Sequence, residues 1–445
     1  MAFAPLPTRA VPPCAVPTRR GRTGAATAAR MAAWAGLATL ALAGADVARA
    51  QAHAGPWGIT WGGYGSLSAY RADLTGARLR PDTQFAGSAT GGEWRADADS
   101  RLALQARKAG VADTDWVLQL STSNTESQHY RPHVDWAYVN LPLGERSTVR
   151  LGRQTLPFLR HSETRYVGYA QAAVRPNVTV YGLSTGSPVD GANLTWEGEA
   201  QGGTVRADLG VGRASARVGG GPVHVRHSVV AGLQWQRGDW TGRLAASDFE
   251  LDLSPQNLLP AAWQADCTNC ATVLPARAPT SAIHGRIASA QLVWSGHPWE
   301  VTAEALWRSD STSAFIPRAR GAYVQVSRRW EAWQAQVAAG RMQYREPPLG
   351  LAARDGAPAT VRAGLDALDR FLQSPNDLAQ WQLGLRWDFG AHTALKLQQE
   401  FWRALRDTTT GRRGLVRLDS PPLAATPSLW NGRAQLTTVQ LDFLF

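Results

Sequence analysis

Three kinds of feature are scarce in this 445-residue sequence: cysteine, charge and long apolar runs. It contains 3 Cys, and only 18% of its residues are charged. A membrane protein built from helices needs runs of roughly 18 or more apolar residues, and none occurs beyond residue 50. Tryptophan is abundant instead, with 19 residues. Abundant aromatics without apolar runs are typical of membrane strands that are each only half apolar.

The first fifty residues differ from the rest of the chain. They are basic and proline-containing, and they turn apolar from Met31 to Ala45. That stretch has the length of a signal-peptide core, and Ala48 and Ala50 are small residues at the −3 and −1 positions before Gln51. We therefore expect 1–50 to be a cleaved signal peptide and 51–445 to be the mature protein. A retained membrane anchor is the alternative, which this length disfavours.

The basic character of the sequence lies partly in that leader. Residues 1–50 hold six Arg and one acid, so their removal lowers the formal net charge from +11 to +6. Binding of nucleic acid would favour arginines clustered along one element, whereas here they are spread singly over many segments. The distribution favours a surface or pore that attracts anions, and no nucleic-acid partner is expected.

Apolar and polar residues alternate over segments of about ten residues throughout 51–445. Between Glu93 and Arg107, for example, Trp94, Leu102 and Leu104 alternate with charged residues. Successive side chains of a strand point to opposite faces, so each segment has one apolar and one polar face. Sixteen candidate strands follow, at about 57–70, 94–107, 114–121, 133–140, 147–154, 190–198, 204–213, 223–236, 239–250, 284–294, 299–309, 319–327, 331–343, 380–389, 393–404 and 434–445, with a weaker one at 177–182.

A soluble sandwich also alternates, so the ends of the segments decide between the two folds. Aromatic residues lie at or near many ends, as the girdles of membrane barrels require: Trp94, Trp116, Trp136, Tyr138, Trp196, Trp235, Trp240, Trp294, Trp299 and Trp307. Short connections at 238–239 and 296–298 predict turns, and long ones at 155–177, 252–282, 344–378 and 405–432 predict extracellular loops. We expect an all-β fold, a transmembrane antiparallel β-barrel of about 16 strands with long extracellular loops and an inward-folded constriction loop.

Four motifs in the middle of the chain resemble the proteobacterial general porin superfamily of Gram-negative outer membranes. They are Asp135–Val139 (DWAYV), Arg150–Pro157 (RLGRQTLP), Arg165–Tyr169 (RYVGY) and Val189–Leu194 (VDGANL). The last segment places Val439, Leu441, Phe443 and Phe445 on one face, and outer-membrane barrels similarly end in an amphipathic strand with a terminal Phe. The resemblance implies an outer-membrane location, Phe445 as the signal for the barrel-assembly machinery, contact with membrane lipid and lipopolysaccharide, and a homotrimer.

The predicted polar faces and the 155–175 loop supply the candidate pore residues. Wall candidates are Arg95, Arg101, Arg150, Arg308 and Arg386, which alternate with acids such as Asp97, Asp99, Glu300, Glu304 and Glu400. Charged rings of this kind set the ion preference of a pore. In the loop we expect Arg160, Arg165 and Arg175 to contact anions, Glu163 to pair with an arginine, and Tyr166 and Tyr169 to offer flat surfaces for a solute. A surface loop outside the pore is the alternative.

Two cysteines, Cys267 and Cys270, lie three residues apart in a polar segment. In an exported protein the default is a disulfide; a redox-active pair would be expected beside a βαβ pattern, and none is visible. No nucleophile is paired with a base, and the histidines lack metal-ligand spacing. We therefore expect no enzyme activity, no metal and no cofactor, but a water-filled channel for small hydrophilic solutes with a mild anion preference. A barrel for one substrate, such as an acidic polysaccharide, is the alternative.

Overall fold

The computed structural model describes residues 56–184, 187–218, 221–253, 261–373, 377–406, 415–419 and 429–445. The expected signal peptide, residues 1–50, lies outside these residues. A single antiparallel sheet of seventeen strands dominates the described part. Apart from the two-residue β3 (Trp94–Arg95), sixteen strands form the wall: β1 (Ile59–Asp73), β4 (Arg101–Ala109), β5 (Asp115–Ser123), β6 (His133–Pro142), β7 (Ser147–Gln154), β8 (Val189–Ala200), β9 (Gly203–Val218), β10 (Gly221–Arg237), β11 (Trp240–Leu253), β12 (Ile283–Trp294), β13 (Trp299–Ser309), β14 (Arg318–Trp330), β15 (Trp333–Arg345), β16 (Leu378–Gly390), β17 (Thr393–Ala404) and β19 (Arg433–Leu444).

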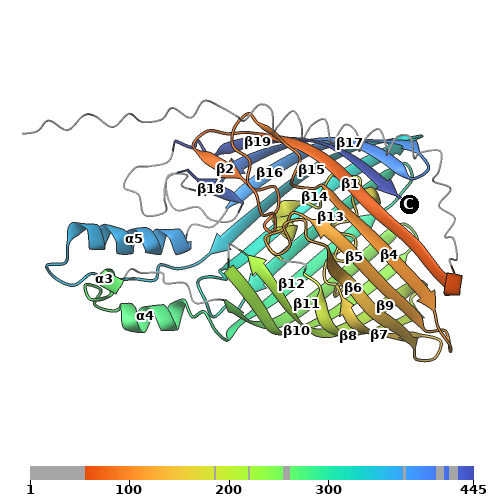
Figure 1. Ribbon diagram of the computed structural model, residues 1–445, viewed down its shortest axis with the longest axis horizontal. Helices are drawn as coiled ribbons and strands as arrows, with labels where there is room; N and C mark the ends of the chain where they lie inside the picture. Colours follow the sequence, from red (N-terminus) through yellow and green to blue (C-terminus); the bar gives the residue numbers. More distant parts are fainter. Residues whose placement is uncertain are drawn as a thin grey trace, which may run out of the picture. The chain divides into compact units, whose positions relative to one another are not determined.

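The sheet closes on itself. Each wall strand pairs with the next one along the chain, and β19 pairs with β1 from Tyr64 opposite Leu444 to Asp73 opposite Gln435. Closure leaves no unpaired edge, which is the condition for crossing a bilayer with strands. The expected barrel and its sixteen strands are confirmed (Figure 1).

The two ends of the barrel differ in their connections: those at one end are all short, and the long ones lie at the other end. At the turn end, the connections are 110–114, 143–146, 201–202, 238–239, 295–298, 331–332 and 391–392. At the loop end, long segments follow β1, β7, β11, β15 and β17. These segments contain β2 (Ala77–Leu79) paired with β18 (Val416–Leu418), and the helices α2 (Val178–Tyr181), α3 (Ala261–Gln264), α4 (Cys270–Arg277) and α5 (Ala359–Gln373). Short helical turns lie at η2 (Pro56–Gly58) and η3 (Gly168–Ala170).

Strands, and not helices, form the wall of the barrel. Among the described residues, no helix is both long and apolar enough to cross a membrane. The helices α3, α4 and α5 lie beyond the loop end of the strands (Figure 1), where Val361, Leu365 and Leu368 of α5 pack in a small separate core with Cys270. The loop end therefore carries a cap with its own apolar core.

The outer wall of the barrel is apolar. Large side chains that alternate along the strands are exposed, among them Leu104, Leu118, Leu209, Leu233, Leu244 and Leu383. Outward tryptophans gather at the turn end, where Trp240 lies beside Trp294 and the rings of Trp333 and Trp387 stack 5.5 Å apart. An apolar band bordered by an aromatic girdle is the lipid-facing surface of a membrane barrel.

Two predicted strands differ from the structure. The segment expected at 94–107 forms a continuous strand only from Arg101, because Ser100 Oγ accepts the Ser68 amide at 3.0 Å and donates to Ala96 O at 2.7 Å. Residues 96–100 therefore leave the wall. The weaker candidate at 177–182 is wrong: it forms α2, where the Asn177 side chain accepts from the Thr179 amide at 3.0 Å.

Two predicted girdle residues also face the other way. Trp136 donates to Thr155 Oγ1 at 3.4 Å, and the Arg150 guanidinium lies 4.5 Å from the centre of the Tyr138 ring. Both rings therefore belong to the interior, whereas Ala137 and Val139, which alternate with them, lie on the outer face.

Candidate pore and constriction

Most of the segment that connects β7 to β8, residues 155–184, folds into the barrel. Its backbone carbonyls accept hydrogen bonds from inward side chains of distant strands. Lys396 of β17 donates to Gly168 O at 2.7 Å and to Ala173 O at 2.9 Å, and Arg386 of β16 donates to Tyr169 O at 2.7 Å. Ser289 of β12 donates to Phe158 O at 3.0 Å. The segment thus contacts several walls of the lumen at once and narrows it.

Two loop arginines predicted to contact anions are buried instead. Arg175 forms ion pairs with Asp99, at 2.7 Å, and with Glu400 of β17. Arg165 pairs with Asp82 at 3.1 Å and donates to Ser184 O and Tyr181 O. Guanidinium groups already enclosed by carboxylates and carbonyls have no surface for a solute. They anchor the inward segment to the wall strand β17, through Glu400, and to the connection between β1 and β4, through Asp82 and Asp99.

Asp82 belongs to a second segment that the sequence did not reveal. The connection between β1 and β4 meets the first segment through Asp82 and Asp99. Burial alone would raise the pKa of Asp82, but the Arg165 guanidinium and the hydrogen bond from the Gln84 amide together lower that pKa below its usual value. Asp82 therefore stays ionised and keeps the two segments joined.

Arg160 of the inward segment and Arg150 of the wall each keep about a quarter of the side chain exposed to water. Arg160 forms an ion pair with Glu300 at 3.1 Å and donates to Thr302 at 2.8 Å. Glu163 pairs with Arg150 of the wall strand β7 and not with one of the loop arginines. Desolvation and the neighbouring Arg160 lower the pKa of His161 to about 3, so its ring is neutral.

The two loop tyrosines are already stacked. The Arg101 guanidinium lies 4.5 Å from the ring centre of Tyr166, and that of Arg386 lies 4.6 Å from the ring centre of Tyr169. Each ring therefore has one face covered by a cation. Tyr169 also donates to Ala391 O at 3.2 Å, which ties the segment toward the turn end.

The remaining predicted wall residues, Arg95 and Arg308, also have partners within the protein. Arg95 lies in β3, opposite Tyr70 at the loop end of β1, and pairs with Asp97 at 2.6 Å. Arg308 donates to Pro317 O at 2.9 Å and to Leu183 O at 3.1 Å. The partners of Arg308 are backbone carbonyls, which every residue carries, so alternation alone did not reveal them.

A cavity of about 490 Å³ lies between the inward segment and the wall of β13–β16. Polar and charged side chains line it, including Arg160, Tyr169, Asn177, Glu300, Arg329 and Asp388. Both signs of charge are present, so the space suits water and small polar solutes.

Ser121, His133 and Asp135 meet on the inner wall of β5 and β6. Ser121 Oγ lies 3.1 Å from His133 Nε2, and Asp135 Oδ1 lies 2.8 Å from the same nitrogen. A nucleophile and the acid that orients its base must use opposite ring nitrogens, so this cluster is not a catalytic triad. Within the described ranges, no group of three or more His, Cys, Asp or Glu is placed to hold a metal.

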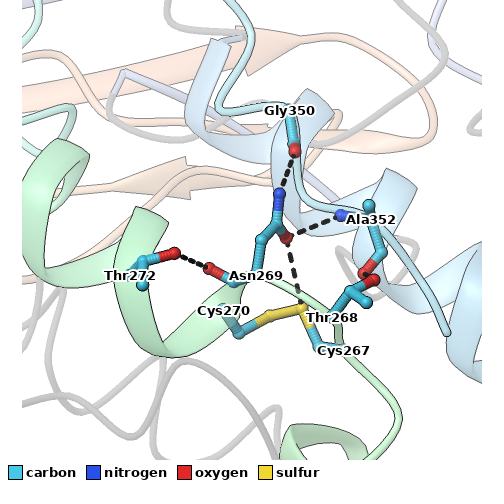
Figure 2. Close-up of a disulfide and its surroundings, with 7 residues drawn as sticks. All are labelled: Cys267, Thr268, Asn269, Cys270, Thr272, Gly350 and Ala352. Atoms are coloured by element: carbon cyan, nitrogen blue, oxygen red, sulfur yellow. Dashed lines mark hydrogen bonds between the residues drawn. A yellow bond between two sulfur atoms is a disulfide. The ribbon is translucent and has the colours of Figure 1, made fainter.

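Residues around the two cysteines join the segments of the cap at the loop end. Cys267 and Cys270 form a disulfide with Cα atoms 5.5 Å apart. The turn between them directs Asn269 at the segment after β15, where Asn269 donates to Gly350 O and accepts from the Ala352 amide, both at 2.9 Å (Figure 2). The disulfide thus fixes a turn whose asparagine joins two long loops.

Neither a protein-family model nor a curated protein matches this chain. Solved structures do. The outer membrane channel DcaP of Acinetobacter baumannii has a TM-score of 0.50 and 11% identity, over 88% of this chain and 99% of that one. An anion-selective porin from Comamonas acidovorans has 0.48 and 12%, over 87% and 99%, and the Salmonella typhi OmpF complex has 0.49 and 9%, over 87% and 97%. With its closed sixteen-strand wall and lipid-facing band, the chain has the porin-type fold of outer-membrane channels.

Proposed function

We propose that the protein is an outer-membrane channel for passive diffusion of small hydrophilic solutes, with a mild preference for anions. The observation that carries the channel is the inward segment 155–184, which contacts the lumen walls and borders a polar cavity of about 490 Å³. A narrowed, charged passage through a lipid-facing barrel is what a selective diffusion pore requires.

In two ion pairs of the wall, the arginine side chain is more exposed to water than its acidic partner, and this supports the anion preference. The side chain of Arg107 is 62% exposed and that of its partner Asp115 is 16% exposed. Arg329 is 45% exposed against 15% for Asp388. The acids are recessed, so a passing ion meets guanidinium groups first, and fixed positive charge raises the local anion concentration within a Debye length, about 10 Å at 0.1 M salt.

Two pairs at the inward segment have the opposite arrangement. Glu163 and Glu300 are more exposed than their partners Arg150 and Arg160. These acids oppose the wall arginines, which is why the proposed preference is mild.

Reversal potentials in a salt gradient across planar bilayers test the proposal. For the wild type we expect stepwise channel openings. We also expect a reversal potential whose sign shows that anions cross more readily than cations. Arg107→Gln with Arg329→Gln should shift the potential toward cations, and Glu163→Gln with Glu300→Gln toward anions, with both shifts shrinking at high salt. Arg153→Gln is the matched control, because Arg153 pairs with Asp190 at the outer face. Absence of conductance steps would contradict the channel, and unchanged potentials in both double variants would contradict only the selectivity.

A further inference from the structure

The outer wall of β12–β16 carries an apolar groove of about 650 Å³. Small side chains form its floor, because the outward positions of neighbouring strands are in register. One row of paired positions across the five strands is Ala290, Ala305, Ala322, Arg341 and Ala379. The next row toward the turn end sets Ala303 and Ala339 among larger residues, namely Leu292, Val324 and Trp381. Alanines bordered by large side chains make a hollow in a wall that elsewhere exposes leucine and tryptophan.

Arginines border the groove on the side of the loop end. Arg341 lines the groove itself. Along β14 and β15, Arg320 and then the opposed pair Arg318 and Arg345 follow, all exposed and outward. Arg320 donates to Gln343 Oε1 at 3.0 and 2.7 Å, which orients its guanidinium. Within the described segments, none of these four arginines forms an ion pair with an acid.

The neighbouring sector of the wall is arranged differently. At the loop end of β10–β12, Arg226 pairs with Glu250 and Asp252, and Arg286 pairs with Asp248 and Asp310. Outward arginines there are neutralised by acids of the same wall. On β14 and β15, by contrast, Arg318, Arg320 and Arg345 form a basic patch directly beside the alanine groove.

We propose that the wall of β12–β16 binds a phosphorylated lipid of the outer leaflet, the lipid A part of lipopolysaccharide. An acyl chain lies in the alanine groove, and lipid phosphates lie against Arg318, Arg320 and Arg345. Guanidinium groups bind phosphate through paired, charge-assisted hydrogen bonds, and small residues allow close van der Waals contact with an apolar chain. The loop end faces outward, because long loops of such barrels are extracellular, and that leaflet carries lipid A.

Native mass spectrometry of the detergent-solubilised full-length mature barrel, with purified lipid A added, tests the charged half of the site. We expect lipid A adducts on the wild type and retention roughly tenfold weaker for each phosphate-binding arginine lost, as in Arg318→Gln, Arg320→Gln and Arg345→Gln combined. Arg226→Gln is the matched control and should bind as the wild type does. Equal retention by the triple variant, with normal single-channel conductance showing that it is folded, would overturn the proposal.

The groove is tested separately. Ala305→Phe fills it and should weaken lipid A retention, whereas Ala231→Phe, at an exposed lipid-facing alanine of β10, should not. Equal retention of phosphatidylglycerol and lipid A by the wild type would overturn the assignment to the outer leaflet. A change in oligomeric state with Ala305→Phe, without loss of lipid A, would show that a second copy of the chain covers this face and would also overturn it.

Discussion

Gly63 of β1 lies directly beneath the aromatic ring of Phe445. The two residues exchange backbone hydrogen bonds, from the Gly63 amide to Phe445 O at 2.7 Å and from the Phe445 amide to Gly63 O at 3.1 Å. A Cβ at Gly63 would lie 2.3 Å from Phe445 Cζ and 2.5 Å from Ala103 O. The seam that closes the barrel therefore depends on the absence of a side chain at this position.

Gly63→Ala should destabilise the closed barrel. The added methyl group must displace both the Phe445 ring and a backbone carbonyl, and overpacking of this kind costs about 1–3 kcal/mol. The measurement is the temperature at which the folded band on an SDS gel converts to the unfolded one. Gly242→Ala is the control, since a Cβ there meets nothing within 4 Å. Equal conversion temperatures for the two variants would contradict the role of Gly63.

Deleting Phe445, or replacing it with Asp, should impair insertion into the membrane. Its ring stacks on that of Phe443, at 6.3 Å between centres, and completes the outward face of the seam. The yield of heat-modifiable protein in outer-membrane fractions measures the effect. Phe389→Asp removes an outward aromatic of β16 at the same end and serves as the comparison. If both variants assemble equally well, Phe445 has no special place in recognition by the assembly machinery.

Arg175→Gln should loosen the constriction. The change leaves Asp99 and Glu400 buried without their cation, and breaking a buried ion pair in this way costs about 3–5 kcal/mol. We expect larger and noisier single-channel conductance together with a lower melting temperature. Arg153→Gln breaks an exposed pair and should change neither quantity measurably. Wild-type conductance in the Arg175 variant would show that another contact holds the segment.

The cap should depend on Asn269 more than on the sulfur bond that fixes its turn. Asn269→Ala removes both hydrogen bonds to the segment at 350–352 and should speed proteolytic cleavage of the two loops. Replacing Cys267 and Cys270 with Ser should have a smaller effect on cleavage and little effect on channel opening. Alkylation and mass spectrometry of protein from oxidised envelopes should find both thiols blocked; free thiols there would contradict the disulfide.

Cleavage of the leader is expected between Ala50 and Gln51. The intact mass of the protein extracted from outer membranes decides this, because the expected mature chain begins at Gln51. Detection of a peptide that contains Met31 in that material would refute the interpretation.

Alternation predicted the strands because successive wall residues face lipid and the lumen in turn. The polarity of each side chain therefore follows from its own position in the strand and can be recognised in a short stretch of sequence. The contacts of the constriction were not accessible in this way. Arg175 meets Glu400 across 225 positions of sequence, and its burial depends on closure of the whole wall. Ala137 and Val139 did carry a signal that Trp136 and Tyr138 point inward, since an apolar pair alternates with them; the strand-end position of the two aromatics was the weaker guide.

Lys396 joins the inward segment to the last two strands of the wall. Its ammonium holds Gly168 O and Ala173 O and pairs with Asp442 at 2.8 Å, so β7–β8, β17 and β19 all contribute to one buried contact. The strands β17 and β19 come last along the chain. The width of the passage therefore depends on the end of the chain, because the cation that holds the inward segment is itself held by β17 and β19.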